Sequence, residues 1–109
     1  MIGGNVVGTL QKKSISGKNV LGERIEEWSN GHDITGWLDM MSGTSEMSKF
    51  NAKLQNATHI FVCDYTDISG YTSINSRMLV NGTVYNILYI DDPMLLHYQL
   101  EIYLQYVGE

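Results

Sequence analysis

The chain has 109 residues, 43% of them hydrophobic, and its 7 Lys and Arg against 12 Asp and Glu give a net charge of −5. A chain of this length builds one thin core, so residues 1–109 are expected to form a single domain. After residue 58 Arg77 is the only Lys or Arg, which argues against strong sequence-independent DNA binding, because such binding depends on neutralising phosphates.

The N-terminal residues predict no export. Met1–Leu10 is rich in glycine and lacks the basic and apolar regions of a signal peptide. The longest apolar runs, Ile60–Cys63 and Ile87–Ile90, are far shorter than the ~20 residues that span a bilayer. A single cysteine, Cys63, cannot form an intrachain disulfide. We therefore expect a soluble protein made in a reducing cytoplasm, with residues 1–6 as a flexible terminus.

Three short strands are predicted in the first half of the chain. Val7–Ile15, Arg24–Trp28 and Thr35–Met41 are rich in β-branched and aromatic residues. They are separated by Gly17–Gly22 and by Ser29-Asn30-Gly31, which are typical turn sequences.

The next segment, Ser42–Ala57, has no strand alternation. Loops this long are uncommon in compact domains and are usually functional or disordered, so residues 42–57 are predicted to be a long functional loop. Met47, Phe50 and Leu54 lie at i, i+3 and i+7, a spacing that allows about three helical turns with a narrow apolar stripe. An extended loop and a short helix both remain open.

The second half of the chain predicts a strand at Thr58–Tyr65 and then a hairpin. The two arms of the hairpin, Arg77–Val80 and Thr83–Ile90, flank Asn81-Gly82, and both of these residues tolerate the positive φ of a type I′ turn. Asp91-Asp92-Pro93 is expected to end the second arm, because proline donates no hydrogen bond to a sheet.

The C-terminal segment Tyr98–Tyr106 predicts a half-buried strand, because apolar and polar positions alternate along it. The total is about six mostly antiparallel strands separated by turns. This pattern favours an all-β fold, a small β-barrel with one long inserted loop, over an α/β fold.

The candidate catalytic and metal-binding groups do not converge in the sequence. His32, His59 and His97 have no partner at metal-ligand spacing. His59 and Cys63 would share one face of a strand at a separation of roughly 13 Å, too far for a nucleophile and its base. Asp64–Gly70 only superficially matches a calcium loop. We therefore expect no enzyme activity, no cofactor and no metal.

Seven tyrosines stand out, five of them between Tyr85 and Tyr106. They could stack on single-stranded nucleic acid, but only Arg77 would accompany them. The barrel core and a subunit interface, where Tyr is enriched, fit better. Tyr103 is expected to face outward. The candidate interface residues are Tyr89, Tyr98, Tyr103 and Tyr106.

From Trp28 onward, the order of residues resembles the head-tail joining, or head-closure, proteins of long-tailed bacteriophages. Length and acidic balance look most like the stopper proteins of SPP1-type connectors. The sequence departs from the family pattern at Met40, where proline is common, and at Asp64, where relatives often have a basic residue. The matching positions are Trp28, Ser42-Gly43 with Glu46, Thr58-His59, Arg77, Gly82, Tyr85 with Ile87, and Asp92-Pro93.

The resemblance implies a virion protein at the head-tail interface that forms a ring of its own copies beneath the portal and its adaptor protein. It implies that the ring closes the DNA channel after packaging, holds double-stranded DNA sterically, docks the tail completion protein and opens for ejection. The alternative is a small interaction or oligonucleotide-binding barrel without gating. Lys49 and Lys53 are the candidates for a phosphate contact in the long loop. The candidate gating residues are Ser42, Gly43, Glu46, Met47, Lys49, Phe50, Lys53 and Leu54.

Overall fold

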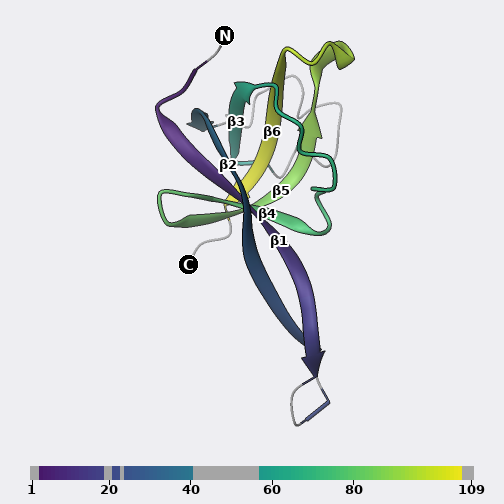
Figure 1. Ribbon diagram of the computed structural model, residues 1–109. Coiled ribbons are helices and arrows are strands. Elements are labelled where there is room, and N and C mark those ends of the chain that lie inside the picture. Colours follow the sequence, from purple (N-terminus) through teal and green to yellow (C-terminus); the bar gives the residue numbers. More distant parts are fainter. Residues whose placement is uncertain (1–2, 19–20, 23, 41–56, 107–109) are drawn as a thin grey trace.

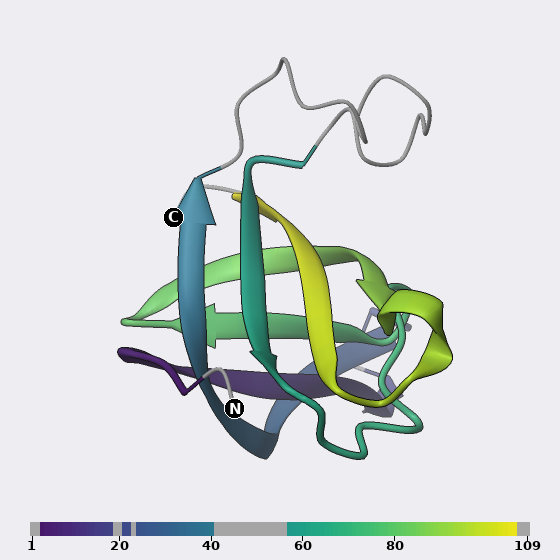
Figure 2. The ribbon, with the colours of Figure 1, turned by 90° about the horizontal axis from the view of Figure 1, so that it is seen from above.

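The computed structural model describes residues 3–18, 21–22, 24–40 and 57–106, which form a closed barrel of six antiparallel strands (Figures 1 and 2). The strands pair in the order β1-β2-β3-β6-β5-β4. The expected all-β barrel is therefore confirmed. Its elements are β1 (Val6–Lys18), β2 (Arg24–Met40), β3 (His59–Asp64), β4 (Ser76–Val80), β5 (Thr83–Asp91), the 3₁₀ turn η2 (Pro93–Leu95) and β6 (Gln99–Tyr106).

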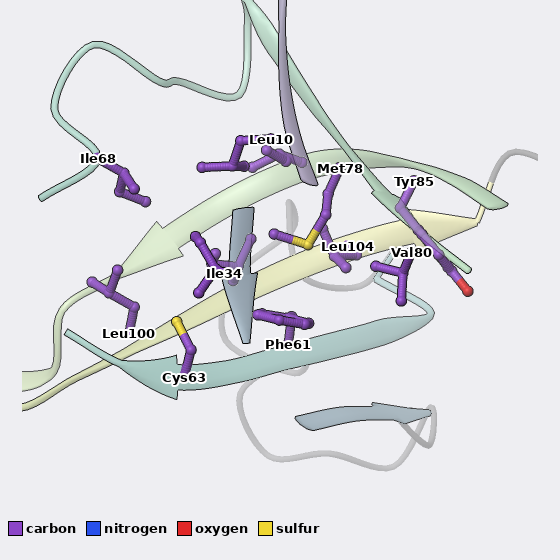
Figure 3. Close-up of a cluster of buried hydrophobic side chains, with 12 residues drawn as sticks. Leu10, Ile34, Phe61, Cys63, Ile68, Met78, Val80, Tyr85, Leu100 and Leu104 are labelled. Carbon is purple, nitrogen blue, oxygen red and sulfur yellow. The ribbon is translucent and has the colours of Figure 1, made fainter. Parts of the chain in front are cut away.

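Alternation along the strands fills the barrel with apolar side chains (Figure 3). Side chains at every second position of a strand point to the same face, and in β6 these are Leu100, Ile102 and Leu104, all buried. Phe61 of β3 is completely buried, and Ile68, from the loop after β3, joins the same cluster. The described strands therefore enclose one continuous core.

The hairpin between β4 and β5 has the predicted turn. Val80 pairs with Thr83, and the two residues between them have positive φ, 51° at Asn81 and 81° at Gly82. Both angles are those of a type I′ turn, whose twist matches that of the flanking strands. The prediction from Asn-Gly is confirmed.

The two strands expected at Arg24–Trp28 and Thr35–Met41 are one continuous strand, so the turn predicted at Ser29-Asn30-Gly31 is wrong. Leu10 pairs with His32 and Gln11 with Asn30, which leaves Gly31 as the extra residue of a β-bulge. The Tyr71 hydroxyl packs against it, and a Cβ at this position would lie only 1.9 Å from that oxygen. Ser29-Asn30-Gly31 therefore forms a bulge within β2 and does not end the strand.

The distal parts of β1 and β2 project from the barrel as a two-stranded arm (Figure 1). The pairing of β1 with β4 stops at Lys12 opposite Ser76, whereas its pairing with β2 continues to Lys18 opposite Arg24. The molecule is elongated, with principal extents of 47 × 28 × 26 Å.

The N-terminal residues contact the barrel. The Gly3 amide donates to Asp64 Oδ2 at 3.1 Å, and the Asn5 amide donates to the Gly36 carbonyl at 3.0 Å. Val6 already belongs to β1. The sequence predicts a flexible terminus at residues 1–6, but these hydrogen bonds hold Gly3 and Asn5 against the strands.

Candidate functional site

The loop between β5 and β6, Asp92–Tyr98, presents a run of exposed apolar side chains at the end of the barrel away from the arm (Figure 1). Met94 is 86% exposed and Leu95 78%. Met94, Leu95 and His97 all have positive φ, between 56° and 57°. Bulky side chains rarely adopt this conformation, and it persists only where surrounding contacts impose it.

Asp92 supplies several of those contacts. Its carbonyl accepts the Leu95 amide at 2.8 Å, its Oδ1 accepts the His97 amide at 3.0 Å, and its Oδ2 pairs with His97 Nδ1. The His97 ring also packs on Tyr65, with centroids 4.5 Å apart. The loop is thus held by the Asp92 carboxylate, by backbone hydrogen bonds to Asp92 and Pro93, and by one ring contact, while its apolar side chains are exposed.

The outer face of β3, β6 and β5 carries acidic groups, and we call this surface the acidic wall: Asp64, Asp91, Glu101, Tyr89 and Tyr103. Asp91 stands directly opposite Glu101 in the sheet. Glu101 accepts hydrogen bonds from Gln99 Nε2 at 2.9 Å and from the Tyr103 hydroxyl at 3.3 Å. Burial and the nearby Glu101 and Asp91 carboxylates raise the pKa of Tyr103 to about 12.

A cationic surface, the basic wall, lies at the root of the arm and consists of Lys13, Trp28 and Arg77, which the strand register places on one face. The Arg77 guanidinium lies 4.2 Å from the centroid of the Trp28 ring, and Lys13 Nζ lies 6.0 Å from it. Such cation–π contacts stabilise the cation over the ring face. Lys12, the preceding residue of β1, points to the other face, where its Nζ packs on the Tyr71 ring at 4.8 Å.

A polar chain across three strands fixes the position of Arg77. Its Nε donates to Gln11 Oε1 at 2.7 Å, and Gln11 Nε2 donates to Asn30 Oδ1 at 2.8 Å. Gln11 is buried in this row. The planar guanidinium is thereby held against the indole, a preorganised arrangement for contact with a carboxylate or a phosphate. Sequence analysis missed this surface, because its members come from three separate strands.

The four candidate interface tyrosines do not form one exposed patch. Tyr98 is 75% exposed and precedes β6, although alternation placed it on the inner face. Tyr106 and Tyr89 are partly exposed. Tyr103 is only 3% exposed and stacks on Tyr89 with centroids 6.3 Å apart. Tyr103 therefore lies on the outer face of the sheet, as expected, but Tyr89 covers it and its side chain is buried.

The candidate gating residues lie outside the described residues, since positions 41–56 are not among them. Of the long loop, only Ala57 is described. Next to it, the Thr58 amide donates to the Leu104 carbonyl at 2.8 Å, and Thr58 Oγ1 accepts the Tyr106 amide at 2.7 Å. The chain therefore re-enters the barrel directly beside the C-terminal end of β6.

Cys63 has no accessible thiol. It is completely buried in β3, and this burial, together with the Asp64 carboxylate, raises its pKa to about 11. A buried, protonated thiol is a poor nucleophile. His59 instead makes an edge contact with Tyr85, with centroids 5.0 Å apart.

Asp67 forms a turn. Its Oδ1 accepts the Ser69 amide at 3.1 Å, and these hydrogen bonds from Ser69 lower the pKa of the Asp67 carboxyl. Among the described residues, no three His, Cys, Asp or Glu side chains are grouped so that they could hold a metal ion. The described part of the chain also contains no helix long and apolar enough to cross a membrane.

The fold places this protein in the class of small closed β-barrels. Solved structures of other proteins have a similar fold. A protein from Shigella flexneri 2a, known from its solution structure, is similar with a TM-score of 0.73 and 23% sequence identity, covering 100% of this chain and 97% of that chain. A chain of the virion of the native gene transfer agent particle is similar with a TM-score of 0.59 and 13% identity, covering 92% and 91%. At these identities the similarity establishes the fold.

No protein-family model matches the chain. No curated protein matches it either.

Proposed function

We propose that this protein is a structural subunit of a phage-type particle, and that within the particle it serves as the stopper of the head-tail connector. The observation that carries the proposal is the fold similarity, over 92% of the chain, to a chain of a gene transfer agent virion. The ordered motifs from Trp28 to Asp92-Pro93 support the same assignment independently of the fold. In this role the protein has no catalytic activity and needs no cofactor.

The proposed subunits form a ring beneath the portal and its adaptor protein. The barrel is suited to be a rigid ring segment, because strand pairing closes completely around its core. The apolar loop Asp92–Tyr98 and the arm lie at opposite ends of the molecule (Figure 1). A ring of such subunits would offer two different faces, one to the adaptor protein and one to the tail completion protein.

The channel is closed by the long loop, residues 42–57, of each subunit. If the loop folds back as a hairpin, eight residues at ~3.3 Å each reach ~26 Å, enough to bring loops from several subunits together at a pore axis. The barrier is steric. The net charge of −5 suits a conduit, because an acidic lining does not hold phosphates as a basic one would. The channel opens when the tail signals ejection, because the loops then exchange their contacts with one another for contacts with the wall of the channel.

Deleting the gene from the phage genome that carries it tests the role. The expected capsids package DNA, then lose it, and remain without tails, and supplying the protein in trans restores both functions. Tailed particles with full genomes would contradict the proposal.

Paired cysteines test the gate separately. Placed at Lys49 and Lys53 in a Cys63→Ser background, they should cross-link neighbouring subunits in filled particles and block DNA release until a reductant is added. The matched control is the same pair under reducing conditions throughout. Normal ejection from cross-linked particles would remove the gating assignment and leave the structural role standing.

A second candidate, an oligonucleotide-binding barrel, is favoured by one observation, the contact of Lys13 and Arg77 with the Trp28 ring. Aromatic rings beside cations are the elements of a single-strand binding surface. The acidic balance of the chain opposes it, and the DNA titration described in the Discussion separates the two candidates.

A further inference from the structure

Charge is segregated by strand around the barrel. The sequences of β1 and β4 contain Lys12, Lys13, Lys18 and Arg77 and no Asp or Glu. The sequences of β3, β5 and β6 contain acidic residues and no Lys or Arg. β2 carries both signs. The charged residues that define the basic wall and the acidic wall are therefore of opposite sign.

The central strands of the two walls, β1 and β6, are not neighbours in the sheet. In the closed order β1-β2-β3-β6-β5-β4, β6 is three strands away from β1 in either direction. Figure 2, which looks along the arm, shows β1 and β6 on different sides of the barrel. Lys13 of β1 and Glu101 of β6 therefore come from strands that are not adjacent, and the sheet does not pair them within one molecule.

The acidic wall keeps two like charges in direct opposition. Asp91 and Glu101 are cross-strand partners, an arrangement that destabilises an isolated sheet. Lys or Arg on a neighbouring surface would relieve this repulsion. The Tyr103 hydroxyl donates to Glu101 and the Tyr103 ring stacks on Tyr89, while the basic wall offers Trp28 and Arg77. Trp, Tyr and Arg are the residues that dominate binding energy in interfaces.

We propose that copies of this protein associate head to tail, with the basic wall of one copy against the acidic wall of the next. Two different patches make a heterologous contact, which closes into a ring or continues as a filament, whereas a patch that pairs with itself stops at a dimer. The proposal rests on the ring assembly of the proposed function and names the surfaces that build it. A second copy is favoured over DNA because the complementary charge is present on the same chain, which is acidic overall.

Carbodiimide cross-linking of the purified full chain tests the contact, since this reagent joins a Lys amine directly to a carboxylate. In an equal mixture of ¹⁴N- and ¹⁵N-labelled protein at low salt, where charges are screened least, we expect a ladder that continues beyond the dimer. Mixed-isotope peptides should join Lys13 to Asp91 or Glu101. A product that stops at the dimer, or only monomer, would overturn the proposal.

Charge reversal gives the sharper form of the test. Lys13→Glu alone and Asp91→Lys alone should each reduce the ladder at least tenfold, and mixing the two variants should restore it, because each junction then again pairs opposite charges. The control, Glu27→Lys, changes the net charge as Asp91→Lys does, at an exposed position on the other face of the arm from Lys13 and Trp28, and should leave the ladder unchanged. Unaltered melting temperatures show that each variant is folded.

The outcome also separates this contact from its alternatives. If Lys13→Glu leaves the ladder intact but lowers DNA retention in a gel shift, the basic wall binds phosphate and the proposal is wrong. If the ladder forms as expected while deletion of the gene leaves particles intact, the contact stands and the virion function fails.

Discussion

Gly31 and Tyr71 illustrate how a single residue decides the path of a strand. The bulge at Gly31 allows β2 to run through without a break, and the Tyr71 hydroxyl occupies the space where a side chain would be. Overpacking of this kind forces neighbouring groups to move.

We therefore expect Gly31→Ala to destabilise the protein by about 1 to 3 kcal/mol in urea denaturation. The matched variant is Gly31→Ala with Tyr71→Phe, which removes the closest atom, so that the next contact lies at 3.0 Å. The double variant should recover part of the loss. An equal loss in both would show that the clash with the hydroxyl is not the cause.

Cys63 couples stability to pH. Burial raises the pKa of the Cys63 thiol from 9.0 to about 11, so the unfolded state loses its proton first as pH rises. The contribution of the protonated thiol to the free energy of unfolding is fully present below pH 9 and declines as pH rises towards 11. At 1.36 kcal/mol per pKa unit, the decline amounts to up to about 2 to 3 kcal/mol.

The measurement is the difference in unfolding free energy between wild type and Cys63→Ala from pH 8 to 11, because other groups titrate equally in both proteins. The difference in unfolding free energy between wild type and Cys63→Ala should become smaller as pH rises. In addition, a thiol reagent at pH 8 should modify Cys63 only in denaturant. Rapid labelling of the folded protein would contradict the burial of this side chain.

At the scale of elements, the loop Asp92–Tyr98 depends on one carboxylate. Asp92→Ala removes the acceptor of the His97 amide and the partner of the His97 ring, and we expect a cost of about 1 to 2 kcal/mol. Amide exchange at His97 should become much faster. Asp91→Ala, which removes the neighbouring carboxylate, is the control and should leave that exchange unchanged. Equal effects of both variants would show that Asp92 does not anchor the loop.

At the scale of the whole molecule, the net charge of −5 predicts that the protein does not bind DNA tightly. At about 0.1 M salt, where exposed charges beyond ~10 Å are largely screened, a gel-shift titration should show no complex at low micromolar protein. The single-stranded and double-stranded forms of one sequence should behave alike. Tight binding that weakens steeply with salt would favour the oligonucleotide-binding alternative instead.

The sequence by itself determined the fold class, the Asn81-Gly82 turn and the inward positions of β6, because these depend on local φ preferences and on the two-residue period of a strand. Tertiary structure decided what local pattern cannot encode. Ser29-Asn30-Gly31 has the composition of a turn, but pairing with β1 carries the chain through it as a bulge.

Burial of Tyr103 depends on Tyr89 of the neighbouring strand, and Trp28 meets Arg77 only because β4 closes the barrel beside β1. Likewise, the separation of basic and acidic walls follows from the strand order, which places β1 opposite β6. Periodicity acts over a few residues, whereas these contacts join residues far apart in the chain, and closure of the sheet alone brings them together.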